Sequence, residues 1–141
     1  MSSDGGADDR GNATSDGGSK GMYGGVVLDH FRRPRNNRPL DTPSASEEAF
    51  NPLCGDRVRL EVSVEGDVIV AVGFTANACA VCTAAASMLT ERVTGAAVED
   101  AAGLSDADVL RWLDTALPAG RTACATLPLR ALHAALADLP S

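Results

Sequence analysis

The chain has 141 residues and a formal net charge of −7 at pH 7. Its length suits one domain with one core, and its acidic balance disfavours nucleic acid or an anionic membrane as a partner. No apolar run is long enough to span a bilayer, and the N-terminus lacks the basic-then-apolar pattern of a secretory signal, so we expect a cytoplasmic protein.

The first 21 residues are rich in glycine, serine and aspartate and contain almost no apolar side chains. Such a segment cannot bury enough surface to offset its conformational entropy, so residues 1–21 are expected to form a disordered tail. The folded domain is expected over residues 22–141.

Residues 22–33 are predicted to form a helix. Four side chains recur at helical spacing, and Pro34 stops the pattern: Tyr23, Val27, His30 and Phe31. A basic run then holds four arginines within seven positions: Arg32, Arg33, Arg35 and Arg38. The run is either a solvated helix exit or a patch that docks an acidic partner protein, and both interpretations stay open.

An antiparallel hairpin is predicted in the middle of the chain. Residues 41–48 look like a loop, because they hold Pro43 and several small polar side chains. Residues 57–64 alternate polar and apolar with period two, which indicates a strand, and residues 68–75 form a second β-branched run. The turn at residues 65–67 joins the two strands.

Three helices are predicted to follow. The first covers residues 77–94 with Asn77 as N-cap, the second covers residues 107–117 after Ser105, and the third runs from about residue 121 to residue 139. The predicted fold class is therefore α+β, a small antiparallel β-sheet packed on one face by several α-helices.

The turn at residues 51–56, Asn-Pro-Leu-Cys-Gly-Asp, places the Cys54 thiol two positions from the Asp56 carboxylate. Cys79 and Cys124 both fall near predicted helix N-termini, where the partial positive charge favours thiolate. In a reducing cytosol such cysteines are more often metal-binding or reactive than disulfide-bonded. Three thiolates and one carboxylate suit tetrahedral zinc or an iron–sulfur cluster.

Cys82 adds alternatives, because it lies three positions after Cys79 and helical spacing lets both thiols face one site. It is a candidate alternative ligand in an all-thiolate zinc site that leaves out Asp56. The Cys79/Cys82 pair also fits a redox CxxC, and Cys82 alone fits a small buried side chain.

The ordered part of the chain resembles the NifU/IscU/SufU-type scaffolds of iron–sulfur cluster assembly. Four stretches carry the resemblance in the family's order: YGGVVLDHF with PRN at residues 23–36, NPLCGD at residues 51–56, CAV through SMLT at residues 79–90, and RTAC with LP and AL at residues 121–132. The resemblance covers about residues 22–137.

The resemblance implies the ligand set Cys54, Asp56, Cys79 and Cys124, with Cys124 as candidate persulfide acceptor. It implies a scaffold that takes sulfur from a cysteine desulfurase, builds a transient [2Fe-2S]-type cluster with iron and passes it to acceptor or carrier proteins; it also allows a homodimer. Such a scaffold need not be an enzyme. The alternative is a zinc-bound persulfide acceptor, a sulfurtransferase partner of the desulfurase.

Two expectations refine this site. The Asp56 carboxylate is a harder and weaker partner for iron than a thiolate, so it should leave the cluster labile. Arg121 should help to keep the Cys124 thiol ionised. The chain departs from the family pattern in having Ala123 where His or Lys often precedes the third cysteine, in having Cys82, and in lacking both the long SufU-type insertion and a Leu-Pro-Pro-Val-Lys sequence.

Overall fold

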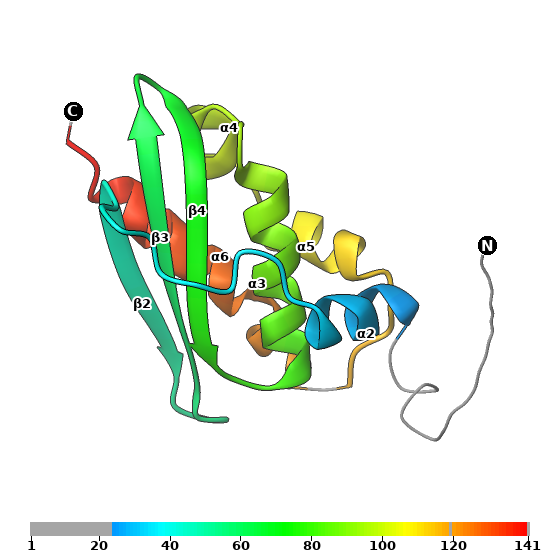
Figure 1. Ribbon diagram of the computed structural model, residues 1–141. Coiled ribbons are helices and arrows are strands. Elements are labelled where there is room, and N and C mark those ends of the chain that lie inside the picture. The colour runs from blue at the N-terminus through cyan, green and yellow to red at the C-terminus, as the bar shows by residue number, and fades with distance from the viewer. Residues whose placement is uncertain (1–23, 119, 141) are drawn as a thin grey trace.

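The computed structural model describes residues 24–118 and 120–140, so the predicted tail lies outside the described residues. The elements follow one another as α2 (Gly25–Arg32), β2 (Ala45–Asn51), β3 (Asp56–Glu65), β4 (Val68–Asn77), α3 (Ala80–Val93), α4 (Val98–Ala102), α5 (Asp106–Leu113) and α6 (Arg121–Ala137) (Figure 1). The predicted α+β class is confirmed. None of the described helices is long and apolar enough to cross a membrane.

The sheet has three strands in the order β2-β3-β4, and both pairs are antiparallel. The predicted hairpin is confirmed as β3 and β4, which reach beyond the predicted ends and contain a register shift between Ser63 and Val64. Val58, Leu60 and Val62 of β3 are fully buried on the inner face, as their alternation predicts.

The predicted loop over residues 41–48 is wrong in its second half, because β2 begins at Ala45. Ala45 pairs with Val62, Glu47 with Leu60, and Ala49 with Val58, so the inner face of β2 carries small or charged side chains. An edge strand built this way lacks the β-branched pattern that identifies a strand. The small side chains suit the close packing of α6 against β2 and β3 seen in Figure 1.

Helices α3 and α6 cover the inner face of the sheet and pack against each other, with α2 against α3 and α5 against α6. Together they bury a continuous apolar core. Its largest fully buried side chains are Phe74, Leu60, Ile69, Leu89, Leu113, Leu127 and Leu132.

The connection from α2 to β2 crosses the outer face of the sheet, as Figure 1 shows. Gly73 of β4 lies beneath it, and a Cβ atom there would stand 2.2 Å from the Arg38 carbonyl oxygen. The Phe74 N–H donates to the Asn36 carbonyl at 2.9 Å, and the Leu40 N–H donates to Glu61 Oε1 at 2.7 Å. These contacts explain why Glu61 is buried on the outer face of β3.

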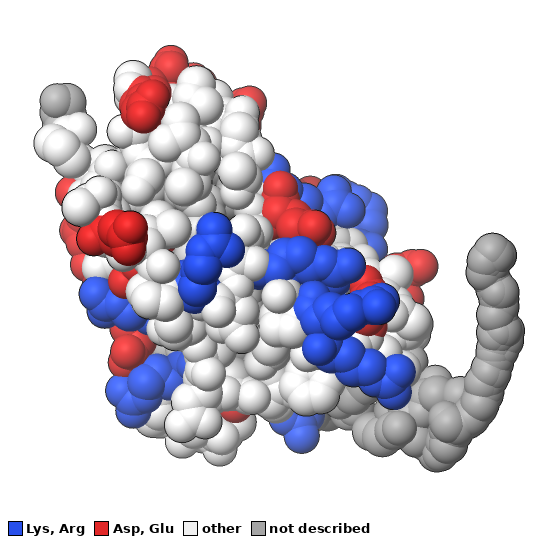
Figure 2. Space-filling model, in the orientation of Figure 1, with Lys and Arg blue, Asp and Glu red and all other residues white. Residues whose placement is uncertain are grey.

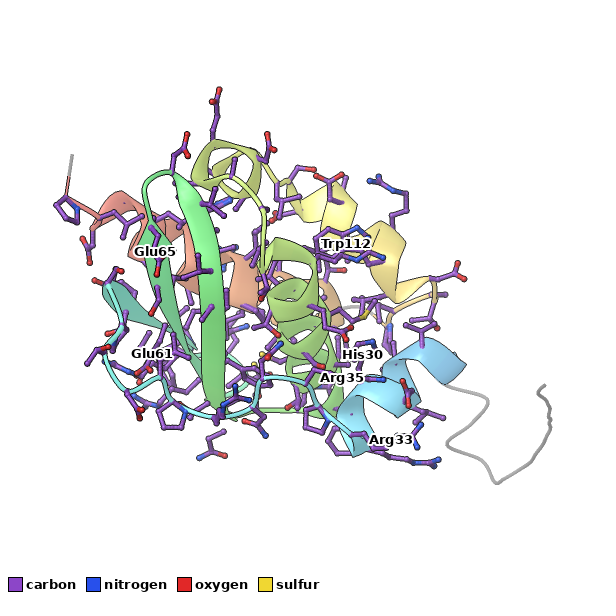
Figure 3. All side chains as sticks on the ribbon, turned by 45° about the horizontal axis from the view of Figure 1, so that its top comes forward. His30, Arg33, Arg35, Glu61, Glu65 and Trp112 are labelled. Atoms are coloured by element: carbon purple, nitrogen blue, oxygen red, sulfur yellow. The ribbon has the colours of Figure 1, made fainter. Side chains whose placement is uncertain are left out.

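A buried polar network joins α2 to α3. His30 Nδ1 lies 2.8 Å from Ser87 Oγ, and the same oxygen accepts the Arg35 N–H at 2.8 Å. Figure 3 shows His30 and Arg35 side by side next to α3. Burial lowers the pKa of His30, and the nearby Arg35 guanidinium lowers it further. The network fixes the N-terminal helix against the helix that begins at the candidate site.

Several helix predictions need correction. Of the four side chains at helical spacing, Val27 and His30 are buried in α2 and Phe31 is exposed, while Tyr23 lies outside the described residues. α5 begins after Ser105, whose hydroxyl completes a capping box with Asp108. It ends at Leu113 rather than residue 117, because Asp114 adopts a left-handed conformation. α4 was not predicted.

The side chains of α5 differ in burial. Val109 and Leu113 are buried, whereas Leu110 and Trp112 are half-buried. The Arg92 guanidinium lies 4.6 Å from the centroid of the Trp112 ring, which accounts for a half-exposed indole on this face.

Candidate metal centre

The β2–β3 turn presents Cys54 and Asp56. Asn51 shapes it: its side-chain oxygen accepts the Leu53 N–H at 3.0 Å and its carbonyl accepts the Gly55 N–H at 2.8 Å. Gly55 has a φ of 78°, a conformation that glycine adopts readily. The turn therefore leaves Cys54 exposed at its tip and returns the chain inward, so that Asp56, the first residue of β3, is buried.

The Asp56 carboxylate is only half satisfied. Oδ1 accepts the Cys79 N–H at 3.1 Å, so the carboxylate holds the start of α3. Oδ2 is buried and has no hydrogen-bond partner among the described residues. A buried carboxylate oxygen without a partner is costly, which is what a metal ligand looks like before its cation is bound.

Cys124 comes close to this carboxylate from α6. Its Sγ lies 3.5 Å from Cys54 Sγ, and the ligand atoms of Cys54, Asp56 and Cys124 all lie within 4.8 Å of one another. Two soft sulfurs and one hard oxygen at this spacing suit zinc or iron. Residues from a turn, a strand and a helix therefore converge at one end of the sheet.

The position of Cys124 in the last helix agrees with the prediction. α6 begins after Gly120, whose φ is 88°, and Cys124 is its fourth residue. The helix continues through Pro128, which has no N–H to give to the Cys124 carbonyl four positions earlier. The helical hydrogen-bond ladder is thus interrupted at the residue that enters the site.

The expected ionisation of Cys124 is wrong for the metal-free protein. Burial raises the pKa of its thiol well above the ordinary value, and the neighbouring Cys54 thiol and Asp56 carboxylate raise it further. Cys124 is fully buried, and neither the helix start nor Arg121 outweighs its desolvation. A bound cation would supply the positive charge that this thiolate otherwise lacks.

Cys79 lies at the rim of the site. It is the N-cap of α3, so the helix starts later than predicted: Asn77 is the last residue of β4 and pairs with Arg57 instead of capping. Cys79 is half-buried, and its thiol is not in the group that lies within 4.8 Å. The structure places it beside Asp56 through its backbone N–H.

Cys82 is fully buried in the first turn of α3 and is not in that group either. Burial raises the pKa of its thiol, and the nearby Asp56 carboxylate raises it further. The sequence predicted these thiols but not the hydrogen bond from Cys79 to Asp56, because the two residues are 23 positions apart and no local pattern links them.

The amino-acid sequence matches a known protein family and several known relatives. The family model of the NifU-like N-terminal domain matches residues 22–141. The chain is 41% identical over 117 residues to the bifunctional protein NifU/MnmA of Rubrobacter xylanophilus, covering 82% of this chain and 24% of that protein. It is 37% identical over 118 residues to the iron–sulfur cluster assembly scaffold protein IscU of Aquifex aeolicus, covering 82% of this chain and 74% of that protein.

A third relative is the zinc-dependent sulfurtransferase SufU of Bacillus subtilis, 36% identical over 84 residues, or 60% of this chain and 56% of that protein. The chain thus spans only part of the relatives it matches, about a quarter of the first and just over half of the third. Among solved structures, the SUF-system scaffold protein of Fervidobacterium islandicum has a TM-score of 0.69 at 23% identity over 84% of this chain and 99% of that one, which supports the fold. This chain belongs to the family of the NifU-like N-terminal domain.

Proposed function

We propose that this chain is a scaffold for iron–sulfur cluster assembly, which accepts sulfur and iron, holds a transient [2Fe-2S]-type cluster and passes it on. One observation carries the proposal: the two thiols of Cys54 and Cys124 meet the buried, unpartnered oxygen of Asp56 within 4.8 Å. Membership of a family whose named members include cluster assembly scaffolds points the same way.

The ligands that we propose are Cys54, Asp56, Cys79 and Cys124. Cys79 is the one ligand that must turn inward, and as an N-cap it has extended backbone angles, so the helix repeat does not fix its side chain. A site with one carboxylate among its ligands releases its cluster more easily than four thiolates would. The cluster is cargo here, so a labile site serves the function.

We propose a cysteine desulfurase as the sulfur donor and cluster-binding proteins as acceptors. Cys124 stays the candidate persulfide carrier, but because it is buried an external donor reaches the accessible thiols of Cys54 and Cys79 first. The Cys124 sulfur, which lies 3.5 Å from Cys54 Sγ, then attacks the outer sulfur of the Cys54 persulfide; the Cys54 thiolate leaves and takes up the Cys124 proton, so that Cys54 ends as thiol and Cys124 as persulfide.

The basic run supports docking of an acidic partner such as the donor protein. Figure 2 shows blue side chains gathered over the α2 end of the molecule. Asp29 pairs with both Arg33 and Arg35, whereas Arg32 and Arg38 are exposed and make no ion pair with any described residue. Two unpaired cations on an otherwise acidic protein favour association with negative charge.

Anaerobic reconstitution tests the function. The full reduced chain is incubated with ferrous iron and sulfide, desalted, and followed by its visible absorption. We expect a cluster chromophore in the wild type and in Cys82→Ala, and its loss in Cys54→Ala, Cys79→Ala and Cys124→Ala. Cys82→Ala is the matched control, since it removes a thiol of the same region outside the proposed ligand set. No chromophore in the wild type would refute the scaffold.

A zinc-bound sulfur acceptor is the second candidate function. The same donors form a tetrahedral zinc site, and one relative is named as a zinc-dependent sulfurtransferase. Zinc content distinguishes the two: tight binding of one zinc per chain with no chromophore on reconstitution would favour the sulfurtransferase.

A further inference from the structure

Cys79 and Cys82 share the first turn of α3 but differ in access. Cys79 is the N-cap and is half-buried, while Cys82, the third helical residue, is fully buried. The Thr83 N–H donates to the Cys79 carbonyl at 3.0 Å and closes this turn around the pair. The Cys79 N–H donates to Asp56 Oδ1 at 3.1 Å, so this turn begins at the candidate centre.

We propose that Cys79 and Cys82 form an internal dithiol that reduces persulfide sulfur to sulfide at the centre. The inference rests on the proposed function, because it needs a sulfur donor. Sulfur delivered as a persulfide is formally zero-valent, whereas a cluster contains sulfide, so each sulfur needs two electrons. A dithiol that closes to a disulfide gives up two electrons.

The step balances in atoms and charge. The Cys82 sulfur attacks the inner sulfur of the Cys79 persulfide anion. The bond between Cys79 Sγ and the outer sulfur breaks, a Cys79–Cys82 disulfide forms, and the outer sulfur leaves with the Cys82 proton as HS⁻. The two thiol sulfurs are oxidised and the delivered sulfur is reduced. A cellular dithiol or small-molecule thiol then reopens the disulfide by exchange.

The arrangement assigns the two roles. An external donor reaches the half-exposed Cys79 but not Cys82, so the buried thiol stays free to resolve the persulfide. The positive end of the 14-residue helix stabilises the persulfide anion at Cys79. Cys79 and Cys82 are the N-cap and the third residue of the same helical turn, at the i and i+3 spacing of neighbouring side chains, so the pair can close without unwinding the helix.

This chemistry also sets the order of the steps in cluster assembly. While the disulfide is closed, sulfide is released beside Cys54, Asp56 and Cys124, which remain available to bind iron. Cys79 joins as the last ligand only after an external thiol reopens the pair. A reducing thiol is therefore needed for cluster completion but not for the first release of sulfide.

The test follows sulfide release from the full chain. Reduced protein is loaded with sodium polysulfide under anaerobic conditions and desalted, and sulfide is measured without added reductant, with peptide mapping of disulfides after alkylation. Because Cys54 and Cys124 form a second close pair, the assay is repeated in Cys54→Ser/Cys124→Ser, which keeps only Cys79 and Cys82. Cys82→Ser and Cys82→Ala are compared in both backgrounds.

We expect about one sulfide per loaded Cys79 and a mapped Cys79–Cys82 disulfide, both lost in the two Cys82 variants, whose persulfide persists until a thiol is added. If Cys82→Ser and Cys82→Ala behave alike, the loss of sulfide release results from the missing thiol rather than from altered packing. In the Cys54→Ser/Cys124→Ser background, equal sulfide release with and without the Cys82 thiol, or an alkylated Cys82 after loading, would overturn the proposal. Reconstitution of Cys82→Ala with preformed sulfide stays intact in either case, so failure here is distinct from failure of the scaffold.

Discussion

The Asp56 carboxylate has two roles: it holds the start of α3 in the metal-free protein, and we propose that it binds iron in the loaded one. Replacing Asp56 by alanine separates these roles. In the metal-free protein, the change removes the charge-assisted hydrogen bond from the Cys79 N–H, which costs about 1.5–3 kcal/mol. It also removes the buried Oδ2 that has no partner, which returns about 1–3 kcal/mol. Because the two effects offset, we expect the free energy of unfolding of the apo protein to change by less than about 2 kcal/mol.

Damage to a metal site normally shortens the lifetime of its cluster, whereas we expect Asp56→Ala to lengthen it. With Asp56→Ala the hard ligand is gone and the thiolates dominate, so we expect the cluster of the reconstituted protein to live severalfold longer; a tenfold change would correspond to about 1.4 kcal/mol in the activation barrier. The assay follows the visible absorption after desalting, with and without a chelator. Urea unfolding of the same apo samples reports the fold.

Asp56→Asn is the matched control. It keeps a side-chain oxygen that can accept the Cys79 N–H but removes the charge, so it should retain the start of α3 while weakening iron binding at that position. A shorter cluster lifetime in Asp56→Ala, with unchanged unfolding, would refute the role of the carboxylate as the labile ligand.

Three further predictions concern the surroundings of the site. Gly73→Ala places a Cβ 2.2 Å from the Arg38 carbonyl oxygen and should destabilise the fold by about 1–3 kcal/mol in urea unfolding; wild-type stability would show that the crossing segment is not held there. Ser87→Ala leaves the Arg35 N–H and His30 without their shared partner, and about 1–3 kcal/mol should be lost in the same assay. Burial lowers the pKa of His30 below 6.5, so the unfolded chain binds more protons and stability should fall as pH drops through 6.5; the slope should flatten in His30→Gln, and equal slopes would contradict it.

Strong local patterns predicted most of the fold. The alternation in β3 and the capping of α5 by Ser105 are encoded within a few residues, and both are confirmed. β2 was missed because its inner face carries Ala45, Glu47 and Ala49, whose strand conformation depends on pairing with β3 rather than on their own propensity. The later start of α3 has a similar cause, since cross-strand pairing keeps Asn77 in β4.

The candidate site was likewise predicted only in part from the sequence. Residue type and position singled out Cys54, Asp56, Cys79 and Cys124. The structure brings Cys54, Asp56 and Cys124 together and leaves the Cys79 thiol outside that group. The ionisation of Cys124 was not predictable, because helix position argues for thiolate while burial, visible only in the folded chain, argues more strongly for thiol. Pattern identifies the donors, but solvent exposure decides their charge.

The difference in solvent exposure among the four cysteines suits a site that is filled and emptied repeatedly. The two deepest thiols, Cys82 and Cys124, are neutral without metal, so the apo centre avoids a cluster of buried negative charges. Cys54 and Cys79 remain accessible at the rim, where a donor or an acceptor can reach them. In the proposed function, iron binding would be coupled to loss of the Cys124 proton, and acidification would favour release of the cluster because it returns that proton.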